Sequence, residues 1–122
     1  MSAVATQIRL SHKMNPYGIT CLQSDKLIIS CNQTHGIYSV DPCSGETIRI
    51  AGSGTEGYAD GDPLTLARFS GPQGLHINET EQCCYVCDGL NHCIRCVPLS
   101  HVKSRYPARG TCIVAPHRFR LY

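Results

Sequence analysis

Apolar residues along this chain come in short groups that turn-forming residues separate. In the second half the groups are two residues long, or alternate with polar positions, and Gly, Pro, Asn and Asp stand between them. No apolar run there is long enough, or spaced at the 3.6-residue period, to form a helix. The pattern therefore predicts an all-β chain. The predicted strands cover residues 18–22, 26–30, 36–40 and 47–51 in the first half and residues 74–77, 84–87 and 93–97 in the second.

The two halves repeat one another. Residues 16–19 (PYGI) resemble residues 72–75 (PQGL) at an offset of 56, and further along, as at His35 and His92, the offset is 57. A fixed period with all-strand content indicates a repeat protein of the β-propeller kind rather than a helical solenoid. The first copy departs from the second at three positions. Cys31, Thr34 and Gly36 stand where the second copy has Asp88, Asn91 and Cys93.

Short motifs follow one another through the second copy: GYADG at 57–61, ARF at 67–69, PQGL at 72–75, YVCD at 85–88 and NHCIR at 91–95. In this order they resemble the NHL repeat, a family named for an Asn-His-Leu-type signature whose repeats form the blades of β-propellers. The resemblance implies that the signature positions support the structure of the blade. These positions are Tyr58, Asp60, Gly61, Arg68, Phe69, Pro72, Gly74, Asp88, Asn91 and His92.

The repeat divides the chain into four parts. We expect an N-terminal lead-in (1–14), a divergent NHL-like blade (15–52), an NHL repeat blade with a long connecting turn (53–98) and a basic, irregular tail (99–122). Prolines and Gly110 interrupt the tail, at Pro98, Pro107 and Pro116, so that only residues 111–114 offer a fourth strand for the second blade.

About two four-stranded blades do not close a propeller, which needs about four to eight. An isolated pair of blades also exposes a sheet edge that invites pairing with another chain. The sequence therefore predicts an incomplete propeller. It is either a fragment of a longer one or a chain that self-associates or recruits further blades.

Asp88, Asn91 and His92 are an acid, an amide and an imidazole, a set that could perform acid–base work or hold a metal ion. Their spacing favours a structural role. Asp88 closes one predicted strand, so its carboxylate is placed to accept N–H groups of the tight turn, and His92 can bridge neighbouring strands. Upstream, we expect Phe69 to be buried between the blades and Arg68 to pair with an acid such as Asp60.

Two C-x-x-C pairs, Cys84 with Cys87 and Cys93 with Cys96, have the spacing of zinc ligands. Each pair spans a predicted strand, however, where residues three apart point to opposite faces. The gap between the pairs, five residues, is also shorter than the about 12 to 20 of common zinc modules. We expect small, buried core cysteines and no metal.

Residues 52–57 match G-x-G-x-x-G, but the turn-like, acidic residues after them cannot form the helix that a dinucleotide site needs, so no cofactor is expected.

The 122 residues carry a formal net charge of only +2, but the charge is uneven. Residues 1–100 hold six Lys or Arg against nine acids, and residues 101–122 hold five basic residues and no acid. The N-terminus lacks an apolar signal-peptide core, and no apolar run reaches the about 18 residues of a membrane span. The nine cysteines are odd in number. Together these features predict a cytoplasmic protein with reduced thiols that does not enter a membrane.

The leading functional prediction is a non-catalytic protein-binding module that acts as a scaffold through its loop face, as the resemblance implies, and no residue is nominated as catalytic. One alternative is RNA binding through the basic tail, although the acidic body weighs against it. The other is a fragment of a propeller enzyme, since an amidating lyase has a related propeller. The metal ligands of that enzyme cannot be matched to positions in this sequence.

Overall fold

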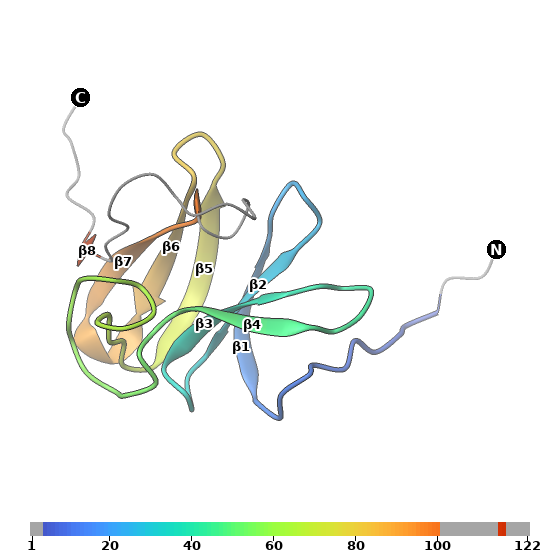
Figure 1. Ribbon diagram of the computed structural model, residues 1–122, viewed down its shortest axis with the longest axis horizontal. Helices are drawn as coiled ribbons and strands as arrows, with labels where there is room; N and C mark the ends of the chain where they lie inside the picture. Colours follow the sequence, from blue (N-terminus) through green and yellow to red (C-terminus); the bar gives the residue numbers. More distant parts are fainter. Residues whose placement is uncertain (1–3, 101–114, 117–122) are drawn as a thin grey trace.

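The computed structural model describes residues 4–100 and 115–116, which form two four-stranded antiparallel sheets. The sheets follow one another along the chain and pack side by side (Figure 1). The first sheet contains β1 (Pro16–Cys21), β2 (Leu27–Cys31), β3 (Gly36–Val40) and β4 (Thr47–Ala51). The second contains β5 (Pro72–Asn78), β6 (Cys83–Asp88), β7 (Cys93–Pro98) and β8 (Ala115–Pro116). The predicted all-β architecture of two four-stranded blades is confirmed. A single 3-10 turn, η1 (Gly89–Asn91), joins β6 to β7.

The predicted strands agree with the observed ones to within two residues at each end, and β3 and β4 agree fully. The fourth strand predicted at residues 111–114 lies outside the described residues. The described fourth strand is β8, which pairs with β7. Pro98 and Pro116 were expected to interrupt the chain, but Pro98 is the last residue of β7 and Pro116 lies in β8, an edge strand, where a proline is tolerated.

The repeat is visible in the backbone. Asp25 and His35 of the first sheet have positive φ angles of 68° and 51°, and Gln82 and His92, each 57 residues later, have φ angles of 56° and 55°. Few non-glycine residues adopt this conformation. The sheets also share an irregularity, because the pairing register shifts near the start of β1 and again near the start of β5. The two sheets are therefore copies of one structural unit.

The hydrophobic core lies between the sheets. Ile28 and Ile37 of the first sheet, Val86 and Val97 of the second, and Phe69 from the connection between them are all fully buried. Burial of such a side chain contributes about 1.5–3 kcal/mol. Leu22, Ile50, Ala51, Ala67, Cys84 and Leu99 complete the buried cluster.

The two sheets contribute opposite faces to this core. Residue Ile28 is equivalent to Tyr85 in the repeat, and Ile29 is equivalent to Val86. We call the side of each sheet that carries Ile28 or Tyr85 its forward face, and the side that carries Ile29 or Val86 its rear face. The forward face of the first sheet packs against the rear face of the second. The sheets are thus stacked in the same orientation, as blades of a propeller are.

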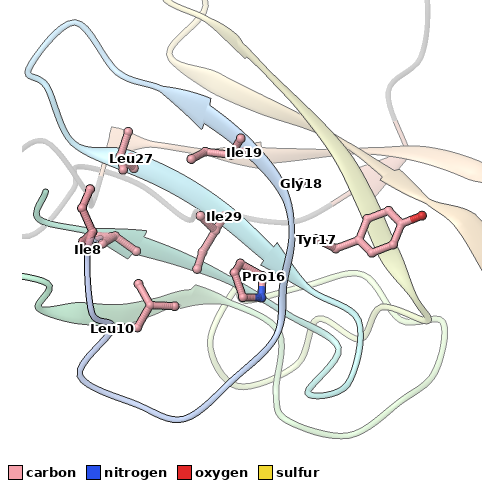
Figure 2. Close-up of a pocket in the computed structure, with 9 residues that line it drawn as sticks. Ile8, Leu10, Pro16, Tyr17, Gly18, Ile19, Leu27 and Ile29 are labelled. Carbon is pink, nitrogen blue, oxygen red and sulfur yellow. The ribbon is translucent and has the colours of Figure 1, made fainter. Parts of the chain in front are cut away.

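The rear face of the first sheet carries a shallow apolar groove of about 300 Å³ (Figure 2). Ile8 and Leu10 of the N-terminal segment lie over one side of it, and Ile19 of β1 lies on the other. Ser11 holds the segment in place, because its N–H donates to the Gly45 carbonyl at 3.0 Å and its Oγ accepts from the Thr47 N–H at 2.9 Å.

Residues 52–71 connect β4 to β5 and fold over one end of the second sheet (Figure 1). Backbone hydrogen bonds within the connection hold it in a defined conformation. The N–H of Ser53 donates to the Ala67 carbonyl at 2.8 Å, and the N–H of Gly57 donates to the Phe69 carbonyl at 3.0 Å. Ala59 and Arg68 form an isolated antiparallel bridge. We call this end of the molecule, where the connection and η1 meet, the loop end.

Candidate functional site

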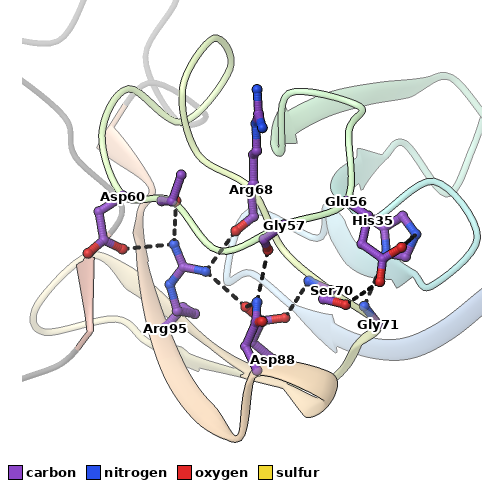
Figure 3. A network of polar contacts seen from close by, with 11 residues as sticks. His35, Glu56, Gly57, Asp60, Arg68, Ser70, Gly71, Asp88 and Arg95 are labelled. Atoms are coloured by element: carbon purple, nitrogen blue, oxygen red, sulfur yellow. Dashed lines mark hydrogen bonds and ion pairs between the residues drawn. The ribbon is translucent and has the colours of Figure 1, made fainter.

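The polar cluster at the loop end is centred on Arg95 of β7. Its guanidinium is fully buried and lies between two carboxylates (Figure 3). Nη1 donates to Asp88 Oδ2 at 2.8 Å, and Nη2 donates to Asp60 Oδ1 at 2.8 Å. Asp88 is also fully buried, whereas Asp60 is partly exposed. Charge-assisted hydrogen bonds of this length are among the stronger ones in proteins.

The register of β6 and β7 brings Arg95 and Asp88 together. Asp88 pairs with Cys93, and Val86 pairs with Arg95. Alternate residues of a strand point to the same face, so Asp88 and Arg95 are diagonal neighbours on the rear face of the second sheet. The short η1 turn fixes this register.

Arg95 also binds the connection. Nη1 donates to the Arg68 carbonyl at 2.9 Å, and Nη2 donates to the Ala59 carbonyl at 2.7 Å, so one guanidinium holds both sides of the small bridge. The guanidinium carbon lies 5.0 Å from the ring centre of Tyr58 and 4.9 Å from that of Phe69. Both distances are within the range of cation–π attraction. The buried Nε atom has no hydrogen-bond partner among the described residues.

Asp88 accepts hydrogen bonds at both carboxylate oxygens. Oδ1 accepts from the Ser70 N–H at 2.7 Å, and Oδ2 accepts from Asn91 Nδ2 at 2.8 Å as well as from Arg95. Asn91 Nδ2 donates in addition to the Gly57 carbonyl at 2.9 Å. The carboxylate and the amide thus attach β6 and η1 to the connection.

The same network continues to the first sheet. Ser70 Oγ donates to Glu56 Oε1 at 2.6 Å, and Glu56 Oε2 lies 3.7 Å from Nε2 of His35 (Figure 3). The Nδ1 atom of His35 accepts the N–H of Gly71 at 3.1 Å. His35 lies in the turn between β2 and β3, so this bond joins the two blades.

Three details differ from the sequence prediction. Arg68 does not supply the cation for Asp60, because Arg95 does, and the Arg68 side chain is exposed. Asp88 binds the Ser70 N–H of the connection rather than the N–H groups of its own turn. His92 is exposed, and no hydrogen bond of its side chain occurs within the described residues. His35 makes the bridging bond instead.

Other signature residues lie in the packed core, at the start of a strand, in a tight turn or on a face of the sheet. Phe69 is fully buried between the blades, as predicted, and Pro72 is buried at the start of β5. Gly61 has a φ angle of 132°, and a Cβ there would lie 2.9 Å from Cβ of Leu66. Gly74 lies on the forward face of the second sheet.

Arg95 was missed by the sequence prediction, although a signal exists. It alternates with Cys93 and Val97, so it occupies a core-facing position of a strand. A cation at such a position requires a buried acid.

The exposure of each cysteine depends on the face of the strand that it occupies. Cys84 lies in the core, and burial raises the pKa of its thiol to about 12. Cys87 lies on the other face and is exposed, and Cys93 and Cys96 are half-buried. The prediction that all four are buried is therefore wrong for Cys87. Within residues 4–100 and 115–116, no three His, Cys, Asp or Glu side chains are grouped so that they could hold a metal ion.

The part of the chain that the structure describes has no helix that is long and apolar enough to cross a membrane. The alternative of RNA binding depends on the basic residues of the tail, which lie outside the described residues: Lys103, Arg105, Arg109, Arg118 and Arg120.

The sequence is similar to parts of several known proteins. The chain is 33% identical over 100 residues to NHL repeat-containing protein 2 of Bos taurus, a match that covers 81% of this chain and 13% of that protein. Its match to NHL repeat-containing protein 2 of Gallus gallus is 34% identical over 86 residues and covers 70% of the chain and 12% of the relative. Protein SUPPRESSOR OF QUENCHING 1, chloroplastic, of Arabidopsis thaliana is 30% identical over 97 residues, with coverage of 80% and 9%.

A solved structure shares the fold. The auxiliary nutrient binding protein of Bacteroides thetaiotaomicron aligns with a TM-score of 0.56 and 22% sequence identity over 81% of this chain and 22% of its own. No protein-family model matches the chain.

The two stacked sheets and the polar cluster between blade and connection define a pair of β-propeller blades. The sequence relatives show which kind: the chain belongs to the NHL-repeat proteins. It spans 9% to 13% of the length of the curated relatives that it matches.

Proposed function

We propose that this chain is a non-catalytic protein-binding module that presents its loop end to a protein partner. The observation that carries this proposal is a set of large apolar side chains that are exposed there. Their exposed fractions are 56% for Tyr58, 39% for Leu64, 59% for Leu66 and 63% for Leu90. Aromatic and large apolar side chains are typical anchors of protein interfaces.

The polar cluster beneath this surface supports the proposal. Arg95 holds the carbonyls of Ala59 and Arg68, and Asp88 holds the Ser70 N–H, so the connection that carries Tyr58 and Leu66 is fixed before a partner arrives. A preorganised surface loses less conformational entropy on binding. Arg95 and Asp88 are paired and fully buried, so they can support the surface of the loop end but are not placed to contact a substrate.

We place the module in the cytoplasm. The eight described cysteines are free thiols, and Cys21, Cys43 and Cys87 are exposed. Reduced, exposed thiols are compatible with the cytosol, where glutathione and thioredoxin keep them reduced.

Affinity capture with matched variants tests the proposal. The immobilised protein is exposed to cytosolic extract, and the retained proteins are compared between the wild type and the double variant Leu64→Ser/Leu66→Ser. Ile48→Ser, which alters an exposed apolar residue of β4, is the control. Circular dichroism confirms that all three are folded. We expect a defined protein to be retained by the wild type and the control and lost by the double variant.

Two results would contradict the proposal. One is equal retention by the double variant, which would mean that the loop end is not the contact surface. The other is loss of the retained protein after ribonuclease treatment, which would favour the RNA-binding alternative.

A further inference from the structure

The contact between the two blades depends on one glycine. A Cβ on Gly18 of β1 would lie 2.1 Å from the carbonyl oxygen of Gln73 in β5, which is closer than real atoms approach. Ser30 Oγ donates to the same carbonyl at 2.5 Å and accepts the Gly18 N–H at 2.9 Å. The forward face of the first sheet therefore contains a socket, made by Gly18 and Ser30, that takes the backbone of the next blade.

The second sheet repeats this socket on its own forward face. Gly74 is equivalent to Gly18, and Cys87 is equivalent to Ser30. A Cβ on Gly74 would meet only Cys87 Sγ, at 3.7 Å, among the described residues. No described strand approaches this second socket. Within residues 4–100 and 115–116, a glycine is thus present at a position where no neighbouring backbone requires one.

The histidine that makes a second inter-blade bond is also present in both sheets. His35 accepts the Gly71 N–H with its Nδ1 atom. His92 is its equivalent, has the same left-handed backbone and is exposed. The imidazole of His92 is therefore placed on the second sheet as that of His35 is on the first.

The first sheet carries the matching surface on its rear side. The residues equivalent to Gly71 and Gln73 are Asn15 and Tyr17, and both are exposed. Beside them lies the apolar groove of Figure 2, which is lined by the exposed Ile19 and by the buried Ile29. This rear face is equivalent to the one that the second sheet packs against the first.

We propose that a second copy of this chain docks head to tail, the forward face of the second sheet of one copy against the rear face of the first sheet of the next. The Tyr17 carbonyl enters the socket at Gly74, and the Asn15 N–H donates to His92. Ile94, which is 45% exposed and equivalent to the core residue Ile37, packs in the groove. The contact repeats the interface that already exists within the chain.

This association is heterologous, because the two surfaces differ and each occurs once per copy. Such contacts form a ring when the rotation closes. About four to eight blades close a propeller, so two, three or four copies would supply them. The loop end stays exposed in such a ring, and the inference does not depend on the protein-binding role proposed above.

The test is the solution mass of the full chain under reducing conditions over a series of protein concentrations. We expect the mass to rise to two, three or four times 13.4 kDa. Gly74→Ala places a methyl group in the socket that the folded single chain can accommodate, so the mass should fall to 13.4 kDa with unchanged circular dichroism. Ile94→Asp, on the same forward face as Gly74, should act in the same way, because it removes the apolar side chain that packs in the groove of the next copy. Leu64→Ser is the control and should keep the assembly.

A wild-type mass of 13.4 kDa at every concentration would overturn the inference, and so would the presence of a blade from a different chain on this face. It would also be overturned if the assembly persisted in both Gly74→Ala and Ile94→Asp. Loss of the assembly in Leu64→Ser would place the contact at the loop end instead.

Discussion

Arg95 and Asp88 lie on adjacent strands with 2.8 Å between Nη1 and Oδ2, and neither side chain reaches solvent. The pair does more than neutralise two charges in the core. Through its remaining hydrogen bonds it attaches the connection between the blades to the second sheet at Ala59, Arg68 and Ser70. The position of the loop end thus depends on a buried ion pair.

Arg95→Met should destabilise the protein by about 3–5 kcal/mol, because it leaves the Asp88 carboxylate buried without its cation. Arg68→Met is the matched control. Its side chain is exposed, so the change in the free energy of unfolding should stay within about 0.5 kcal/mol. Urea denaturation measures both. Equal effects of the two substitutions would contradict the assignment of Arg95 as the central cation.

Gly18→Ala and Gly74→Ala should differ in dilute protein. The first places a Cβ 2.1 Å from the Gln73 carbonyl and forces the blades apart, which should cost about 1–3 kcal/mol of stability. The second meets only Cys87 Sγ at 3.7 Å and should be neutral or slightly stabilising. Thermal unfolding of the two variants measures the difference. A similar loss in both would show that the forward face of the second sheet is not open.

Alkaline pH should weaken the fold through Cys84. Burial raises the pKa of its thiol from 9.0 to about 12, so the fold favours the protonated form. The stabilisation is complete below the unfolded pKa of 9.0 and is lost as the pH rises toward about 12. The free energy of unfolding of the wild type should fall more steeply than that of Cys84→Ala, by up to about 1.4 kcal/mol per pH unit. Parallel pH profiles would mean that the thiol is not buried.

Thiol labelling of the native protein should follow exposure. Cys21, Cys43 and Cys87 are exposed and should react first, whereas Cys31 and Cys84 should react only after unfolding. Cys31 is the informative case. Burial raises the pKa of its thiol, but hydrogen bonds with Thr34 and nearby backbone outweigh burial and set the pKa below its ordinary value. Mass spectrometry after brief alkylation identifies the labelled sites. Rapid labelling of Cys31 would contradict the prediction and show that the lowered pKa of its thiol affects its reactivity more than its burial does.

The fold was predictable from the sequence because its signals are local. The alternation of apolar residues marks the strands, and the offset between His35 and His92 marks the repeat, which the backbone angles bear out. The stacking of forward on rear face follows from the same repeat once the register is known.

The polar cluster was only partly predictable. Asp88 and Asn91 belong to a recognisable motif, but their partners come from the connection, 18 and 34 residues away in the chain. The arrangement of residues 52–71 depends on long-range contacts with β7, which no local pattern encodes. The sequence prediction paired Asp60 with Arg68, which is eight residues away, whereas its partner in the structure, Arg95, is 35 residues away on β7.

Amide hydrogen exchange tests the central claim, that the buried cluster makes the connection a fixed part of the second blade. The N–H groups of Ser53, Gly57 and Ser70 donate to ordered acceptors, so in the wild type they should exchange slowly, as the amides of β6 do. In Arg95→Met the protection at Gly57 and Ser70 should be lost while the first sheet keeps its own. Free exchange of these amides in the wild type, with β6 protected, would contradict the account.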